Sequence, residues 1–310
     1  MNPSIDFTYF IDNFKTEELN RVQSPTRSIG GKGINAGRAA ALSGADVILT
    51  GFLGGKLGRL TREYLEDEEL FQVEMSEIAG ETRTAITVMH DNNSHTQIVE
   101  EGPVVEEEEI FKLLAKVEQI AAKETISSIL LCGTVNSDNE YIFAHMVDYI
   151  YTKISNDIPI LVDISGIQLK NLLTTKGRKP TFIKPNEHEL GYFLDTKIQT
   201  KDDAFNALQH EGFADIHYVI ASLGENGAAC KVGERFYQVS IPKIQVQSVT
   251  GSGDATVGGF AYAIEKKFDP IKAIKYAIAC GMSNAQHKEA GMINKKAAIR
   301  LMEEIIVTEI

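Results

Sequence analysis

Two short runs of wholly apolar residues decide the fold class: ILLC at residues 129–132 and IPILV at residues 158–162. Apolar runs of this length are typical of strands that are buried on both faces of a parallel sheet. Residues 139–154 lie between the two runs, and we interpret them as a helix. A strand, a helix and a second strand in this order predict an α/β fold with a mostly parallel central sheet.

The same alternation continues on both sides of this unit. Further buried strands are predicted at 47–50, 181–184 and 218–222, and further helices at 107–123 and 201–211. Polar and apolar residues alternate in a second class of segment, at 6–11, 21–28, 84–90 and 95–100, with a turn at 91–93. We expect these segments to form a small antiparallel sheet with one solvent-exposed face. Such a sheet, from about 6–28 and 84–100, would be a lid inserted into a single domain spanning 1–310.

Composition excludes several classes of protein. The net charge is −12, with 31 basic and 43 acidic residues, which argues against a nucleic-acid partner. The three cysteines form no CxxC pair, so we expect reduced, buried thiols. With neither a signal peptide nor an apolar span of 18 residues, the chain is expected in the cytoplasm without a membrane partner.

The sharpest chemical motif is the glycine turn Thr250-Gly251-Ser252-Gly253-Asp254, followed by apolar residues at helical spacing. Glycines let the backbone approach a ligand closely, and a helix N-terminus attracts phosphate. Asp254 is expected to stay ionised beside these amides, and it could accept a proton from an attacking hydroxyl. An aspartate that caps the helix explains the same pattern equally well.

A second glycine motif is GGKGINAGR at residues 30–38. The spacing of Gly31, Gly33 and Gly37 fits a loose dinucleotide fingerprint, but the preceding segment is polar and alternating, which does not suit a Rossmann strand. We interpret the loop as a cradle for a polar substrate, with Lys32 near a phosphate and Asn35 on hydroxyls. The alternative is a tight turn with a solvated lysine.

Two further loops follow apolar strands. Lys184-Pro185-Asn186-Glu187-His188-Glu189 lies where ligands bind in α/β folds, and Asn186 with Glu189 could organise Mg²⁺ through waters. A helix-capping arrangement explains this segment as well. Ser222-Leu223-Gly224-Glu225-Asn226-Gly227 reads as a turn between strands that could contact a nucleotide.

Taken together, these motifs resemble the phosphofructokinase-B branch of the ribokinase-like sugar kinases. GGKGINAGR and VTGSGDATVGGF look like the two family signatures, and IKPNEHEL and IASLGENGA fall between them in the expected order. The resemblance covers essentially the whole chain and implies a three-layer α/β/α fold with a β-sheet lid. Finer features resemble the tagatose-6-phosphate kinase subgroup, namely the segments at 2–6, 80–83, 101–103, 241–245 and 281–286.

The resemblance implies ATP-dependent transfer to the 1-hydroxyl of a ketohexose 6-phosphate, with Mg²⁺, and a homodimer formed through the lid. Asp254 would be the base, and Gly251, Ser252 and Gly253 the anion hole. The residues implied on the sugar side are Asp6, Gly31 and Asn35 for hydroxyls, and Arg83, Lys32 and Arg21 for the 6-phosphate. The residues implied on the nucleotide side are Lys184, Asn186, Ser222, Gly224, Gly227 and Asn284, with Glu189 acting on Mg²⁺ through water.

Two departures accompany the resemblance. Gly133-Thr134-Val135-Asn136-Ser137-Asp138 stands where the family has Gly-Ser-Leu-Pro, so Thr134 keeps the matching hydroxyl but the identity of the sugar is open. The chain also opens on Met-Asn-Pro, without an apolar strand, and we expect several residues of a first strand upstream.

The alternatives are 1-phosphofructokinase or 6-phosphofructokinase activity, a catalytically idle sensor of nucleotide or sugar phosphate, and an NADP-dependent reductase. Only the altered 133–138 loop supports the sensor, and only the glycine spacing supports the reductase.

Overall fold

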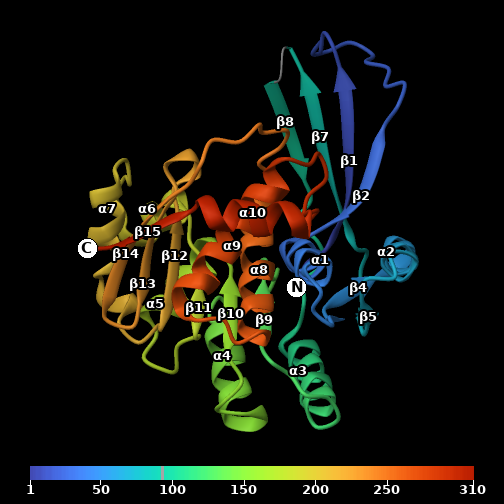
Figure 1. The fold of residues 1–310 in the computed structure, drawn as a ribbon. Coiled ribbons are helices and arrows are strands. Elements are labelled where there is room, and N and C mark those ends of the chain that lie inside the picture. Colours follow the sequence, from blue (N-terminus) through green and yellow to red (C-terminus); the bar gives the residue numbers. More distant parts are fainter. Residues whose placement is uncertain (92–93) are drawn as a thin grey trace.

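A central sheet of seven strands organises the computed structural model, which describes residues 1–91 and 94–310 (Figure 1). In sheet order the strands are β15 (Ile306–Glu309), β14 (Arg235–Ser240), β13 (Ala228–Val232), β12 (Tyr218–Ser222), β11 (Phe182–Ile183), β10 (Ile160–Asp163) and β9 (Ile129–Cys132). The strands β9 to β12 run parallel, whereas β13, β14 and β15 pair antiparallel. The predicted α/β class is therefore confirmed, with a mixed sheet.

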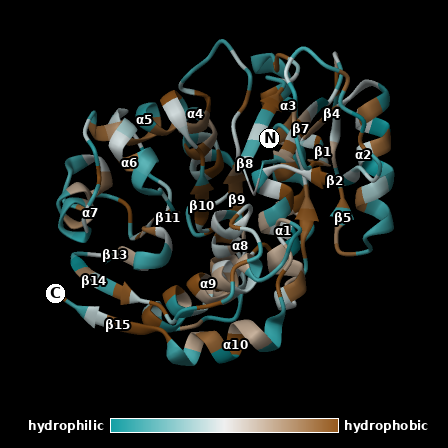
Figure 2. Cartoon of the chain, turned by 90° about the horizontal axis from the view of Figure 1, so that it is seen from above, coloured by the Kyte–Doolittle hydropathy of each residue, from teal (hydrophilic) through white to brown (hydrophobic). Residues whose placement is uncertain are grey.

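Helices cover both faces of this sheet and give three layers (Figure 2). One face carries α3 (Glu107–Ala121), α4 (Ile142–Tyr149), α5 (Gly166–Thr174), α6 (Glu187–Leu194) and α7 (Lys201–Leu208), and the other carries α1 (Lys32–Ser43), α8 (Ser252–Glu265), α9 (Pro270–Ala285) and α10 (Lys295–Glu304). Side chains alternate between the two cores: Ile160 and Val162 pack on the first face, and Leu161 packs on the second. The helix predicted at 139–154 ends as a π-helix at Ile150–Ile154.

The strand predicted at 47–50 is not part of the central sheet. β3 (Ile48–Leu49) pairs with β5 (Gln72–Val73), and the neighbouring β4 (Phe52–Gly54) pairs with β6 (Ser76–Ile78). Leu49 is buried in a separate small core with Leu65 of α2 (Gly55–Asp67). An apolar run indicates that a strand is buried but not which strand it pairs with. The sequence alone therefore could not show that 47–50 lies outside the central sheet.

A four-stranded sheet projects from this body (Figure 1). Its order is β2 (Thr26–Gly30), β1 (Ser4–Ile11), β7 (Arg83–His90) and β8 (Ser94–Val99). The expected all-antiparallel arrangement is wrong at one pair, because β1 and β7 run parallel. A long crossover through α1 and α2 joins them, and such a crossover permits parallel pairing. β2 begins at Thr26, later than predicted, and the turn predicted at 91–93 falls in part outside the described residues.

Within residues 1–91 and 94–310, no helix is long and apolar enough to cross a membrane.

Candidate active site

The glycine turn at residues 250–253 leads directly into α8. Gly251 caps the helix with a φ of 79°, and a Cβ atom there would lie 2.7 Å from the Cβ of Ala290. Only glycine fits both the left-handed backbone and the close approach of that neighbour. The helix begins at Ser252, which places Asp254 in its first turn. The backbone amides of this turn are therefore at the positive end of the helix dipole.

Asn284 holds the turn from behind. Its Nδ2 donates to the carbonyl of Thr250 at 2.8 Å and to Ser252 Oγ at 3.2 Å, and its Oδ1 accepts from Gly291 N at 2.7 Å. The residue has no exposed surface. The resemblance implies Asn284 on the nucleotide side; in the structure its side-chain polar atoms are shielded from solvent and are used to support the turn.

Asp254 is buried, with 8% of its surface exposed, and Asn35 Nδ2 of α1 donates to its Oδ2 at 2.8 Å. Burial and the nearby charge of Asp163 raise the pKa of Asp254 to about 6, although the Asn35 hydrogen bond and the charges of Lys32 and Lys184 act to lower it. Asp254 was expected to stay ionised because of the helix terminus and its hydrogen bonds; desolvation outweighs these contributions and raises the pKa, but not above neutral pH. A carboxyl group with a pKa near 6 is still mostly ionised at pH 7 and accepts a proton more readily than an ordinary aspartate.

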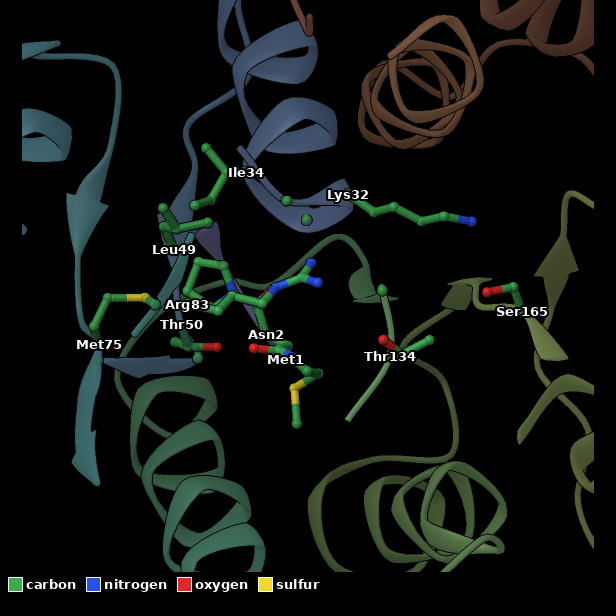
Figure 3. Close-up of a pocket in the computed structure, with 15 residues that line it drawn as sticks. Met1, Asn2, Lys32, Ile34, Leu49, Thr50, Met75, Arg83, Thr134 and Ser165 are labelled. Carbon is green, nitrogen blue, oxygen red and sulfur yellow. The ribbon is translucent and has the colours of Figure 1, made fainter. Parts of the chain in front are cut away.

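Lys32 lies between two carboxylates. Its Nζ is 3.0 Å from Asp163 Oδ1 and 3.3 Å from Glu189 Oε1. Burial acts to lower the pKa of Lys32, but these two carboxylates outweigh it and raise the pKa above its usual range. The side chain extends away from Arg83 (Figure 3). The Lys32 ammonium is therefore held by these carboxylates, although Lys32 and Arg83 both line the cavity described below.

Asp163 was missed by the sequence analysis. It is the last residue of β10 and is 1% exposed. Because it ends a parallel strand, the rule that pointed to Lys184 at the end of the next strand could have found it.

A cavity of about 160 Å³ opens beside Lys32, between the body and the four-stranded sheet (Figure 3). Of the predicted sugar-side residues, Gly31, Lys32, Arg83 and Thr134 line it. Ser165, which the sequence analysis did not select, also lines it. Arg83 is held by donating to the carbonyls of Asn2 at 3.3 Å and Glu100 at 3.1 Å, and burial lowers its pKa.

Asp6 and Arg21 lie outside that lining. Asp6, on β1, accepts a hydrogen bond from Ser4 Oγ at 2.6 Å, and burial raises its pKa although Ser4 and Arg83 oppose the shift. Asp6 nevertheless lies close enough to the cavity-lining Arg83 for the arginine charge to act on its pKa. Arg21 is exposed in the loop between β1 and β2, so the structure does not bring it to the cavity.

The predicted nucleotide-side residues gather at the ends of β11 and β12. Lys184 is buried, and a Cβ atom on Gly253 would lie 3.0 Å from its Nζ, so its ammonium reaches the glycine turn. Asn186 and Ser222 form an isolated bridge between the two strand ends. Gly224 faces open space, whereas a Cβ on Gly227 would lie 2.1 Å from the carbonyl oxygen of Val239. Gly227 is therefore required for packing on β14.

The helix-capping arrangement, the alternative interpretation of 184–189, is present. Asn186 Oδ1 accepts from the backbone N–H groups of His188 and Glu189, and Glu189 Oε2 accepts from Asn186 N at 3.0 Å. Across residues 1–91 and 94–310, no three His, Cys, Asp or Glu side chains are grouped to hold a metal. Since both oxygens of Glu189 have protein partners, this residue fits Mg²⁺ through intervening waters, as Mg²⁺ is often bound.

The altered loop at 133–138 is firmly anchored. Val135 exchanges two hydrogen bonds with the side chain of Gln168, at 3.2 and 2.7 Å. Asn136 donates to the carbonyl of Gly102 at 2.9 Å and accepts from Val105 N at 2.8 Å. Thr134 is left exposed at the cavity wall.

This combination of a glycine turn, a buried aspartate and a projecting sheet agrees with the comparison to protein families. Residues 1–297 match the family model of the pfkB family of carbohydrate kinases. The chain belongs to that family. It is a carbohydrate kinase, and the ribokinase-like fold that the sequence resemblance implied is confirmed.

Solved structures with this fold are similar over nearly the whole chain. The crystal structure of phosphofructokinase-2 from Escherichia coli with fructose-6-phosphate is 21% identical, with a TM-score of 0.82, covering 98% of this chain and 96% of that chain. A Thermotoga maritima protein described as a possible 1-phosphofructokinase is 23% identical, with a TM-score of 0.86, covering 100% and 98%. At these identities the similarity establishes the shared fold.

Proposed function

We propose that this carbohydrate kinase transfers the γ-phosphoryl group of ATP to the 1-hydroxyl of a ketohexose 6-phosphate, with D-tagatose 6-phosphate as the substrate and D-tagatose 1,6-bisphosphate as the product. The observation that carries the proposal is Asp254, buried in the first turn of α8 and influenced by the charges of Lys32 and Lys184. Such a carboxylate lies where a phosphoryl group would meet the helix N-terminus.

The proposed chemistry uses the chain's own groups in distinct roles. Asp254 orients the attacking hydroxyl and accepts its proton. The backbone N–H groups of residues 251–253 stabilise negative charge on the transferring group, and so does the Lys184 ammonium, which lies close to Gly253. Closure of the four-stranded sheet, acting as a lid, would exclude water and strengthen these interactions.

Arg83 is the proposed anchor for the 6-phosphate. It lines the cavity and is already held in place by two backbone carbonyls, so little side-chain freedom is lost on binding. Asp6, Gly31 and Asn35 are the proposed partners of sugar hydroxyls, with Thr134 at the cavity wall. A phosphate anchor makes an unphosphorylated sugar a poor substrate.

The proposed nucleotide side consists of Lys184, Asn186, Ser222, Gly224 and Gly227. Mg²⁺, held through waters near Glu189, would supply neutralisation of the phosphate charge. Gly224 leaves room for a ligand, whereas Gly227 shapes the turn that presents it.

Phosphofructokinase activity is the second candidate. It is favoured by the similarity to the Escherichia coli and Thermotoga maritima structures named above. Fructose 6-phosphate differs from tagatose 6-phosphate at one stereocentre, so the same phosphate anchor and base would serve both.

A cytoplasmic homodimer formed through the four-stranded sheet is also proposed. Phe10 and Ile98 of that sheet are 60% and 62% exposed, and burying large apolar side chains of this kind favours association. Light scattering at several concentrations tests the assembly, and a monomer at every concentration would refute it.

A panel assay tests the proposed function. ADP formation is measured with tagatose 6-phosphate, fructose 6-phosphate, fructose 1-phosphate and ribose at equal concentration. We expect the highest kcat/KM with tagatose 6-phosphate. A preference for fructose 6-phosphate or fructose 1-phosphate would support the second candidate, and a preference for ribose would contradict the phosphate anchor.

A further inference from the structure

Arg38 stands behind the proposed base without reaching the cavity. It lies three residues after Asn35 on α1, so both side chains emerge from one face of the helix. Arg38 NH1 donates to Asn35 Oδ1 at 3.2 Å, and Asn35 Nδ2 donates in turn to Asp254 Oδ2 at 2.8 Å. The exposed fractions are 7% for Arg38, 6% for Asn35 and 8% for Asp254. A buried chain of hydrogen bonds therefore connects the guanidinium to the carboxylate.

Every N–H group of Arg38 has an internal acceptor. Glu68 accepts a fork of two bonds, from Nε at 2.8 Å and from NH2 at 2.7 Å. NH1 also donates to the carbonyl of Ala290 at 3.1 Å, and NH2 donates to that of Ile29 at 3.4 Å. With the bond to Asn35 these contacts use all five donors of a guanidinium. Arg38 therefore has no donor left for a substrate, and contacts with four different residues fix the position of its guanidinium.

A fixed donor at Asn35 Oδ1 determines which way the amide faces. An asparagine amide can be turned through half a rotation without changing its shape, so its neighbours choose the orientation. The turned amide would set an NH₂ group against the guanidinium and an oxygen against the carboxylate. Both contacts are repulsive, so Arg38 keeps the donor end of Asn35 on Asp254.

We propose that Arg38 is a positioning residue for phosphoryl transfer, which holds Asn35 so that its amide donates to Asp254. The inference rests on the proposed role of Asp254 as the base. An ion pair with Glu68 that serves only to stabilise the fold is the competing explanation. The two differ in what happens at Asp254 when Arg38 is changed and the chain stays folded.

The groups around Asp254 determine in which direction its pKa changes when Arg38 is substituted. Asp163 at the end of β10 disfavours the charged form, while Lys32 of α1, Lys184 after β11 and the Asn35 hydrogen bond favour it. Loss or reversal of the Asn35 hydrogen bond removes one of the favouring contributions. The pKa of Asp254 then rises, so a higher pH is needed to ionise the base than in the unmodified chain.

Arg38→Lys is the variant that tests the proposal. A lysine keeps the charge, but it cannot contact Glu68 and Asn35 with the planar fork of arginine. We expect kcat to fall about tenfold, the acid limb of the kcat/KM profile to move about half a pH unit upward, and KM for ATP to stay within about twofold. In Arg38→Ala, millimolar guanidinium should restore part of kcat. Arg62→Lys is the matched control, because Arg62 donates to the carbonyl of Met75 outside this network and should leave the pH profile unchanged.

An activity-independent measurement separates failure of this inference from failure of the proposed function. We compare the melting temperature gained by Asp254→Asn near pH 8 in the unmodified chain and in the Arg38→Lys background. A larger gain in the second background supports the link, even if no sugar is turned over. Folded Arg38 variants whose acid limb and melting-temperature gain match the unmodified chain would overturn the proposal and leave Arg38 a structural residue. A panel without turnover by the unmodified chain would overturn the proposed function alone.

Discussion

Lys32 Nζ lies 3.0 Å from Asp163 Oδ1 and joins the first glycine loop to the end of β10. The two residues are 131 positions apart in sequence, and Asp163 is 1% exposed. Lys32 therefore places a positive charge in the candidate site before any ligand binds. That charge acts to lower the pKa of Asp254, whereas burial and the charge of Asp163 raise it.

Replacing Lys32 by methionine should therefore affect stability and pH dependence together. The free energy of unfolding should fall by about 3 kcal/mol, because the buried charge of Asp163 loses its partner. The acid limb of kcat/KM should move to higher pH, since a charge that lowers the pKa of Asp254 is removed. Urea unfolding and a pH–rate profile measure the two effects.

Lys112→Met provides the control for that experiment, because Lys112 forms an exposed ion pair with Glu108 on α3. It should change neither the melting temperature nor the pH profile. A Lys32→Met chain as stable as this control would show that the pair contributes nothing.

Gly251→Ala should disrupt the turn that leads into α8. The added Cβ would lie 2.7 Å from the Cβ of Ala290, on a backbone with a φ of 79°. We expect a loss of about 3 kcal/mol in the free energy of unfolding, together with a large loss of kcat.

Gly233→Ala separates the clash from the backbone strain. Gly233 also has a positive φ, 56°, but its nearest contact is His217 Cε1 at 3.8 Å. It should cost only about 1 kcal/mol and leave kcat unchanged. Equal effects of the two substitutions on kcat would argue against a special role for the 250–253 turn.

Asn284→Ala distinguishes an internal support from a nucleotide contact. The variant loses the bonds to Thr250 and Ser252 and leaves Gly291 N unpaired, so the free energy of unfolding should fall by about 2 kcal/mol. We expect kcat to fall while the Kd for ATP, measured by calorimetry, stays within about twofold. A Kd raised more than tenfold in a folded variant would restore Asn284 to the nucleotide side.

Much of the fold could be predicted because its strongest signals are local. The apolar runs that became β9 and β10 and the glycine turn before Asp254 each occupy a few neighbouring residues. The pairing of β3 and the parallel run of β1 beside β7 depend on residues distant in sequence, which periodicity does not encode.

The same limit applies to the candidate site. Residue type and motif selected Asp254, Asn35 and Lys184, which the structure brings close to one another. The ion pair of Lys32 with Asp163 and the link through Arg38 arise from packing between distant segments. The direction of the Asp254 pKa shift likewise depends on burial, which a motif does not report.

Asp254→Asn should stabilise the chain above about pH 6. The folded-state pKa is raised to about 6, so between pH 4 and 6 the folded chain holds the proton more tightly than the unfolded one. The stability of the unmodified chain therefore falls as pH rises through that window, whereas asparagine does not titrate. The variant should gain on the order of 2 kcal/mol near pH 8 and nothing near pH 4, as measured by urea unfolding. Equal gains at both pH values would mean that the pKa of Asp254 is not raised.

The turnover of that variant tests the central claim most directly. ADP formation by Asp254→Asn is measured with saturating ATP and the best sugar phosphate of the panel, alongside the Kd for each ligand. If Asp254 is the base, kcat falls about 10³-fold while both Kd values stay within about threefold. A folded variant that keeps kcat within about tenfold of the unmodified chain would contradict the assignment.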